Sequence, residues 1–242
     1  MRPVILRLDD ALDAQTGFLR AAGALGCQEV KAMDLGPSMR LWSSASTLSR
    51  LHRRLSEDLP PGDRADLVFA GSGDFHHVSP LLIERALARF GGPLTVIHFD
   101  NHPDWIRFAR GRHCGSWVGA ACRLAGVDKL ITIGVCSADI GRGRAGQGEV
   151  NLLETGKLEL YPWDAPDGAA QMRLGSRYRP TVCGLGETTF MALLDSRVKT
   201  EQVYITLDKD VLTPSEAITN WDQGRASLDF VTRAITQVAS GR

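Results

Sequence analysis

The chain has 242 residues, of which 43% are hydrophobic and 23% charged, a composition typical of a globular protein with a sizeable core. Lys and Arg together number 28, as do Asp and Glu, so the formal net charge is zero. This balance lacks the basic surface of nucleic-acid-binding proteins and favours a small-molecule partner. No apolar run reaches the roughly 18 residues that cross a bilayer. We therefore expect a cytoplasmic protein with no membrane partner, folded as a single domain over residues 1–242.

The cysteines argue against disulfides and against a structural zinc knot. They are odd in number, widely spaced and never arranged as CxxC: Cys27, Cys114, Cys122, Cys136 and Cys183. A disulfide framework or a thiolate zinc site would show paired spacings. We therefore expect reduced thiols.

Strand-like segments alternate with helix-like segments along the chain. In chain order, strands are expected at 4–8, 29–35, 65–72, 94–100, 129–135, 157–163, 202–208 and, with a weaker pattern, 181–186. Amphipathic helices are expected at 11–25, 44–58, 79–90, 116–126 and 226–239. Such alternation is typical of a parallel sheet covered on both faces. The sequence thus predicts an α/β fold with three αβα layers, doubly wound around a mainly parallel sheet, and ligands that bind where the strands end.

Two acids and an imidazole follow the predicted strand at 94–100. In the stretch IHFDNHPDW, Asp100, His102 and Asp104 occupy alternate positions. Alternate residues of an extended chain share one face, so these side chains are expected to point into one cavity. Pro103 has no amide hydrogen and should help to end the strand. His98 lies deeper in the apolar run, and we expect a core histidine whose hydrogen bonds are satisfied.

Two further strand ends carry the same kinds of side chain. ITLDKD places Asp208 and Asp210 two residues apart after an apolar run, and GSGDFHH places His76 and His77 just before a predicted helix. The carboxyl ends of parallel strands meet at one edge of a sheet. We therefore expect four carboxylates and at least two imidazoles to converge.

Four carboxylates in one cavity would repel one another unless cations or protons neutralised them. Two divalent cations carry the compensating charge. Oxygen and imidazole ligands without a thiolate favour Mn²⁺ or a similar ion over a structural zinc site. Two such ions would lower the pKa of a shared water and hold it as a nucleophile. The expected cofactor is therefore a pair of divalent ions, with Mn²⁺ preferred.

These motifs resemble those of the ureohydrolases, the superfamily of arginase, agmatinase and formiminoglutamase. FDNHPD resembles the DAHAD-type metal motif, TLDKDVLTP resembles SxDxDxxDP, and GSGDFHH resembles the GGDH motif. The order and spacing agree from about residue 65 to residue 224. The resemblance implies metal ligation by Asp100, His102, Asp104, Asp208, Asp210 and one of His76 and His77, with His77 preferred because it lies closer to the helix.

Two further segments extend the resemblance. RHCGSWVG is similar to a His-Gly element of the family, which implies that His113 is a catalytic proton shuttle near the leaving amine. IGVCSAD is similar to the GLRDVD segment, which implies that Asp139 contacts the substrate. The family also implies assembly into homo-oligomers.

The resemblance implies hydrolysis of a linear, non-peptide C–N bond in a guanidino, amidino or formimino compound. A metal-bridging hydroxide would attack the planar carbon, Asp104 and the ions would stabilise the tetrahedral intermediate, and His113 would protonate the leaving amine. Two alternatives stay open. One is a metal-dependent amide deacetylase of the same fold, usually with a single zinc, and the other is a non-catalytic metal-binding relative.

The sequence also departs from the family pattern. TPSEAITNWDQG replaces the DPxxAPG-like residues after the last metal aspartate, and Trp105 places a bulky aromatic directly after the DxHxD motif. In the family a strand with a substrate-contacting glutamate follows the last helix, whereas this sequence stops at Arg242. We expect either a truncated product or an incomplete site, and a substrate pocket of different shape.

Overall fold

The computed structural model describes residues 1–145, 147–165 and 167–240. The chain is an α/β protein with mainly parallel sheets. It divides into two compact units, which are described separately: Met1–Leu82 with Phe108–Trp117, and Ile83–Arg107 with Val118–Arg242. The single-domain prediction stays a prediction. Arg242, where the sequence stops, lies outside the described residues.

The first unit contains a three-stranded parallel sheet in the order β2-β1-β4. Its elements are β1 (Arg2–Arg7), α1 (Thr16–Ala24), β2 (Gln28–Lys31), η1 (Gly36–Ser38), β3 (Trp42–Ser43), α2 (Ala45–Asp58), β4 (Asp66–Phe69), η2 (Gly73–Val78), β6 (Arg112–His113) and η3 (Cys114–Ser116). Ser44 caps α2 by accepting the Thr47 N–H, as expected for a serine at this position. Leu51 and Leu55 of α2 are fully buried in this unit's core. The short strands β3 and β6 pair antiparallel.

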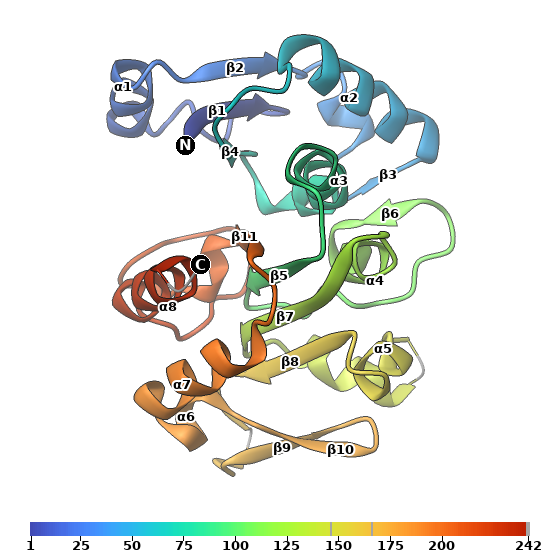
Figure 1. The fold of residues 1–242 in the computed structure, drawn as a ribbon, viewed down its shortest axis with the longest axis vertical. Coiled ribbons are helices and arrows are strands. Elements are labelled where there is room, and N and C mark those ends of the chain that lie inside the picture. The colour runs from blue at the N-terminus through green and yellow to red at the C-terminus, as the bar shows by residue number, and fades with distance from the viewer. Residues whose placement is uncertain (146, 166, 241–242) are drawn as a thin grey trace. The chain divides into compact units, whose positions relative to one another are not determined.

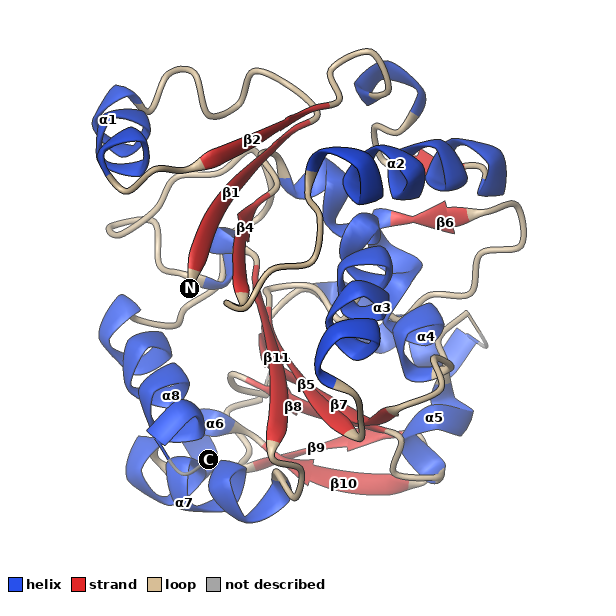
Figure 2. Cartoon of the chain, turned by 45° about the horizontal axis from the view of Figure 1, so that its top comes forward, coloured by secondary structure: helices blue, strands red, loops and turns tan. Residues whose placement is uncertain are grey.

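The second unit contains a four-stranded parallel sheet in the order β11-β5-β7-β8 (Figure 1). Its strands are β5 (Leu94–Phe99), β7 (Val127–Val135), β8 (Leu158–Pro162), β11 (Gln202–Leu207) and the antiparallel hairpin of β9 (Gln171–Leu174) and β10 (Arg177–Pro180). Its helices are α4 (Trp117–Cys122), η4 (Ala138–Ala145), α5 (Val150–Glu154), α6 (Val182–Leu185), α7 (Glu187–Arg197), η5 (Lys209–Val211) and α8 (Leu228–Ser240), while α3 (Ser79–Phe90) runs into this unit from the first. Figures 1 and 2 show α7 and α8 on one side of the sheet and α4 and α5 on the other.

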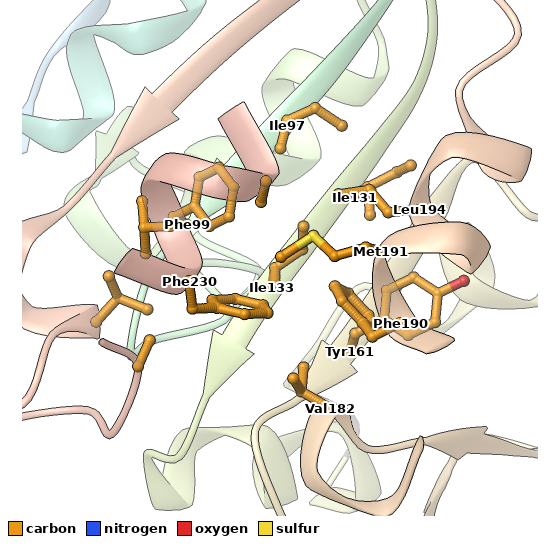
Figure 3. Close-up of a cluster of buried hydrophobic side chains, with 14 of the residues drawn as sticks. Ile97, Phe99, Ile131, Ile133, Tyr161, Val182, Phe190, Met191, Leu194 and Phe230 are labelled. Carbon is orange, nitrogen blue, oxygen red and sulfur yellow. The ribbon is translucent and has the colours of Figure 1, made fainter. Parts of the chain in front are cut away.

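The core beneath α7 and α8 is rich in aromatic side chains (Figure 3). Phe230 is fully buried and meets the Trp163 ring edge to face, with centroids 5.0 Å apart. Phe190 meets Tyr161 in the same way at 5.4 Å. Edge-to-face pairs add to the stabilisation from burial. This packing fixes β5, the strand that leads into the candidate site, because Ile97 and Phe99 of β5 belong to the same cluster.

One predicted strand is wrong. Residues 181–186 contain the helix α6, because the Thr181 side chain accepts the Gly184 N–H at 3.0 Å and caps a helical turn. Glu187, which follows this segment, begins α7 and forms an ion pair with Arg233. No helix among the described residues is both long and apolar enough to cross a membrane.

Candidate metal centre

The candidate centre lies in the second unit, where β5 and β11 end side by side. The two strands pair in parallel, with Phe99 opposite Leu207. The ladder continues one step further, because the Asp208 N–H donates to the Phe99 carbonyl at 2.9 Å. The segments that begin at Asp100 and Asp208 therefore leave the sheet next to each other, as the parallel topology predicts.

Both segments form a tight turn directly after the strand ends. The Asp100 Oδ1 accepts the His102 N–H at 2.6 Å, and the Asp208 Oδ1 accepts the Asp210 N–H at 3.2 Å. An aspartate that holds the amide two residues later forms an Asx turn. The expectation that alternation along an extended chain aligns Asp100, His102 and Asp104 is therefore wrong, since β5 ends at Phe99. A turn brings Asp100 and His102 together instead, and Asp104 joins Asp100 in a different group.

Asp100, His102 and Asp210 form one candidate metal-binding group. Each offers an atom within 4.8 Å of the others. The His102 Nδ1 lies 2.9 Å from the Asp210 Oδ2 and 3.5 Å from the Asp100 Oδ1. Both carboxylates are 2% exposed, so water does little to screen the charge between them.

The electrostatics of this group follow from its burial. Burial raises the pKa of Asp210 to about 7, and the negative charge of Asp100 acts in the same direction. Burial lowers the pKa of His102, but hydrogen bonds to Asp100 and Asp210 outweigh it and raise that pKa to about 12. Without a metal, the imidazolium supplies the positive charge that two buried carboxylates need. Two carboxylates and one imidazole are also a donor set that Mn²⁺ and similar ions accept.

Asp100 also belongs to a second candidate group, together with Asp104 and His98. His98, Asp100 and Asp104 each offer an atom within 4.8 Å of the others. The prediction of a satisfied core histidine is confirmed: His98 is fully buried, its Nε2 lies 2.8 Å from the Asp100 Oδ2, and its Nδ1 lies 3.1 Å from the Thr132 Oγ1. Asp104 is 7% exposed and has φ +45°, a conformation that costs most residues energy but that aspartate tolerates.

Two solved structures share the fold. Proclavaminate amidino hydrolase from Streptomyces clavuligerus superposes with a TM-score of 0.60 and 16% identity, over 98% of this chain and 77% of that enzyme. A hypothetical agmatinase from Burkholderia thailandensis superposes with a TM-score of 0.61 and 16% identity, over 98% of this chain and 74% of the other. The chain has the ureohydrolase fold.

Sequence comparison gives a match of low identity. An uncharacterized protein of Thermotoga maritima is 23% identical over 172 residues, which are 71% of this chain and 52% of that relative. The chain thus spans about half the length of the curated relative it matches. No protein-family model matches. The ureohydrolase fold therefore rests on the structural likeness.

The two candidate histidines after β4 belong to the first unit. The His77 Nε2 lies 2.7 Å from the Ser43 Oγ, and the His77 Nδ1 is buried without a hydrogen-bond partner among the described residues. Burial, helped by the charge of Arg112, lowers the pKa of His77 to about 3, which keeps the imidazole neutral. The His76 ring lies 4.8 Å from the Trp117 ring. Whether His76 or His77 is a ligand in this ureohydrolase fold stays a prediction.

His113, the predicted proton shuttle, also belongs to the first unit. Its Nδ1 accepts the Gly115 N–H at 3.0 Å and caps η3. When the imidazole is neutral, its proton therefore resides on Nε2. The ring lies 5.5 Å from the Phe108 ring. A histidine that acts as a general acid must first become an imidazolium, and the catalytic role of His113 stays a prediction.

Asp208 and Asp139 are not brought into either candidate metal-binding group among the described residues. The Asp208 carboxylate holds the Asp210 N–H instead. Asp139 lies in the first turn of η4, and its carbonyl lies 3.4 Å from the Nε1 of the buried Trp105. The ligand role of Asp208 and the substrate-binding role of Asp139 stay predictions.

Sequence reasoning missed two neighbours of the centre. The Asn101 N–H donates to the Asp210 Oδ1 at 3.0 Å. Asp222 lies 2.8 Å from the His102 Nε2 through its Oδ1. Neither the backbone amide of Asn101 nor the loop residue Asp222 belongs to a repeating sequence pattern, so neither contact could be predicted. Only the departure of TPSEAITNWDQG from the family pattern marked the Asp222 segment as unusual.

Proposed function

We propose that this protein is a metal-dependent hydrolase that cleaves linear C–N bonds other than peptide bonds in a guanidino, amidino or formimino compound. The buried group of Asp100, His102 and Asp210 carries the proposal. The ureohydrolase fold supports it, since a proclavaminate amidino hydrolase shares that fold. A small-molecule substrate accords with the neutral net charge.

The residues of the centre have two roles: some would bind the metal, and others hold those ligands in place. Asp100, His102 and Asp210 would hold a divalent ion, and Asp104 would help Asp100 to hold a second, with Mn²⁺ as the preferred metal. When bound, such ions supply a water activated at neutral pH and polarise the substrate carbon. His98 fixes the Asp100 carboxylate through its Nε2, and Asn101 fixes the Asp210 carboxylate through its amide. Ligands held in this way do not need to reorganise as the ion arrives.

The first experiment measures metal content and turnover together. After reconstitution with Mn²⁺, we expect about two ions per chain. Urea release would be assayed with arginine, agmatine, guanidinobutyrate and guanidinopropionate, and formamide release with formiminoglutamate. Asp210→Asn should lower metal occupancy and abolish turnover. Asp229→Asn is the matched control, because this carboxylate is 75% exposed and lies on α8.

Three results would contradict the proposal. They are the absence of metal uptake by the wild-type chain, full activity of Asp210→Asn, and bound metal with no turnover of any of the five compounds. Uptake of a single zinc ion with amide cleavage would identify a deacetylase instead. Inert bound metal would identify a non-catalytic relative.

A further inference from the structure

The segment between η5 and α8 supplies a second carboxylate to His102. The Asp222 Oδ1 lies 2.8 Å from the His102 Nε2, on the side of the ring away from Asp210. The Asn101 side-chain amide donates to Asp222 twice, to the Oδ2 at 3.2 Å and to the carbonyl at 2.7 Å. We propose that Asp222 is a positioning residue that fixes the His102 ring so that its Nδ1 faces the metal site. This inference rests on the proposed function.

The geometry leaves one nitrogen of His102 for a metal. A neutral imidazole has one N–H donor and one acceptor nitrogen. Without a metal, the imidazolium donates from Nε2 to Asp222 and from Nδ1 to Asp210, 2.9 Å away. Because Asp222 is an acceptor at Nε2, the proton that a metal would displace is the one on Nδ1. Metal-binding histidines commonly donate their other N–H to a carboxylate, which sets ring orientation and increases basicity. The pair of Asp222 and His102 has this arrangement.

The loop that carries Asp222 is tied to the segment that carries Asp210. The Gly224 N–H donates to the Asp210 carbonyl at 2.5 Å, and the Gln223 side chain donates to the Leu212 carbonyl at 3.0 Å. A Cβ at residue 224 would lie 2.3 Å from the Val211 carbonyl oxygen, so only glycine permits this approach. The ligand and the positioning carboxylate are therefore held by one local structure.

Trp221 restricts the ring further. Its side chain meets the His102 ring edge to face, with centroids 5.6 Å apart. The ring thus has Trp221 against it, Asp222 at one nitrogen and Asp210 at the other. Rotation by half a turn would break both polar contacts. Trp221 and Asp222 lie in the segment TPSEAITNWDQG, so the part of the sequence that departs from the family pattern supports His102.

The exposure of Asp222 separates a positioning role from a structural one. Its side chain is 62% exposed, and exposed ion pairs contribute little to folding stability. Loss of the carboxylate partner of a metal-binding histidine typically weakens metal binding about 10- to 100-fold. Asp222→Ala is therefore expected to weaken Mn²⁺ binding by that factor, while the Tm of the metal-free protein changes by less than about 3 °C.

The test titrates Mn²⁺ into the full chain by calorimetry for the wild type, Asp222→Ala and the control Asp229→Asn. A second readout uses Zn²⁺ as a diamagnetic probe: the wild type should show a slowly exchanging downfield proton from the His102 Nε2–H, absent from Asp222→Ala. That signal is assigned by its loss in His102→Asn. Wild-type affinity in Asp222→Ala, or persistence of the signal, would overturn the inference alone. Failure of the wild type to bind either ion would instead refute the proposed function.

Discussion

Replacing His98 with phenylalanine tests how strongly the core of the second unit supports the centre. His98 is fully buried on β5 and contacts Thr132 through Nδ1 and Asp100 through Nε2. Phenylalanine keeps a planar ring of similar size, so the substitution creates little cavity. Both polar contacts are lost, and a buried carboxylate oxygen loses a donor.

The expected loss of stability is the sum of two contributions. A hydrogen bond to a charged acceptor such as Asp100 contributes about 1.5 to 3 kcal/mol, and a neutral one such as that to Thr132 contributes about 0.5 to 1.5 kcal/mol. His98→Phe should therefore lower the free energy of unfolding by about 2 to 4.5 kcal/mol. For a chain of 242 residues this corresponds to a fall in Tm of roughly 5 to 15 °C.

Urea denaturation of the metal-free protein at pH 8, followed by circular dichroism, measures this loss. Thr132→Val is the matched control, because it removes only the neutral contact from an equally buried position and should cost about 1 kcal/mol. A loss below about 0.5 kcal/mol for His98→Phe would show that His98 does not support Asp100. Equal losses for the two variants would show that the contact with Asp100 contributes nothing.

Two further predictions concern the rest of the second unit. Glu159 is buried and accepts hydrogen bonds from Lys129, Arg197 and Tyr161, which hold its pKa below the ordinary value of 4.5 although burial acts to raise it. Its contribution to stability is therefore present above pH 4.5 and is lost as the pH falls through the lowered pKa. The difference in urea midpoint between wild type and Glu159→Gln should accordingly shrink below pH 4.5, and a constant difference would contradict this reasoning. Phe230→Ala should cost about 3 to 5 kcal/mol by the same assay. The control Phe90→Ala, at a side chain 43% exposed, should cost much less, and equal losses would refute the packing described in Figure 3.

Periodicity predicted the elements that pack an apolar face. The helix expected at 79–90 coincides with α3, and the strand expected at 202–208 differs from β11 by one residue. The hairpin of β9 and β10 was missed because its strands, QMRL and RYRP, have only four residues each, too few for their alternation to stand out. The strand prediction for residues 181–186 was wrong because the capping side chain of Thr181 favours a helical turn there.

Chemistry at strand ends predicted that Asp100, His102 and Asp210 lie together, while their role as metal ligands stays a prediction. Parallel neighbours deliver their carboxyl ends to one edge, and that rule needs only the order of strands and acids. The alternation of side chains along a strand was the wrong reason for expecting Asp100 and His102 on one face. It does not predict an Asx turn, in which the Asp100 carboxylate accepts the backbone N–H of His102. Asp222 was missed because a loop acid 120 residues from its histidine partner follows no repeating pattern.

The adjacency of β5 and β11 also bears on when the centre can assemble. His102 and Asp210 are 108 residues apart in the chain, and a parallel pair needs a crossover before it can form. The entropy of closing so long a loop must be met before these two groups come into range. If the proposed function holds, a nascent or partly refolded chain is expected to lack affinity for a divalent ion, and metal uptake would report the pairing of β5 with β11.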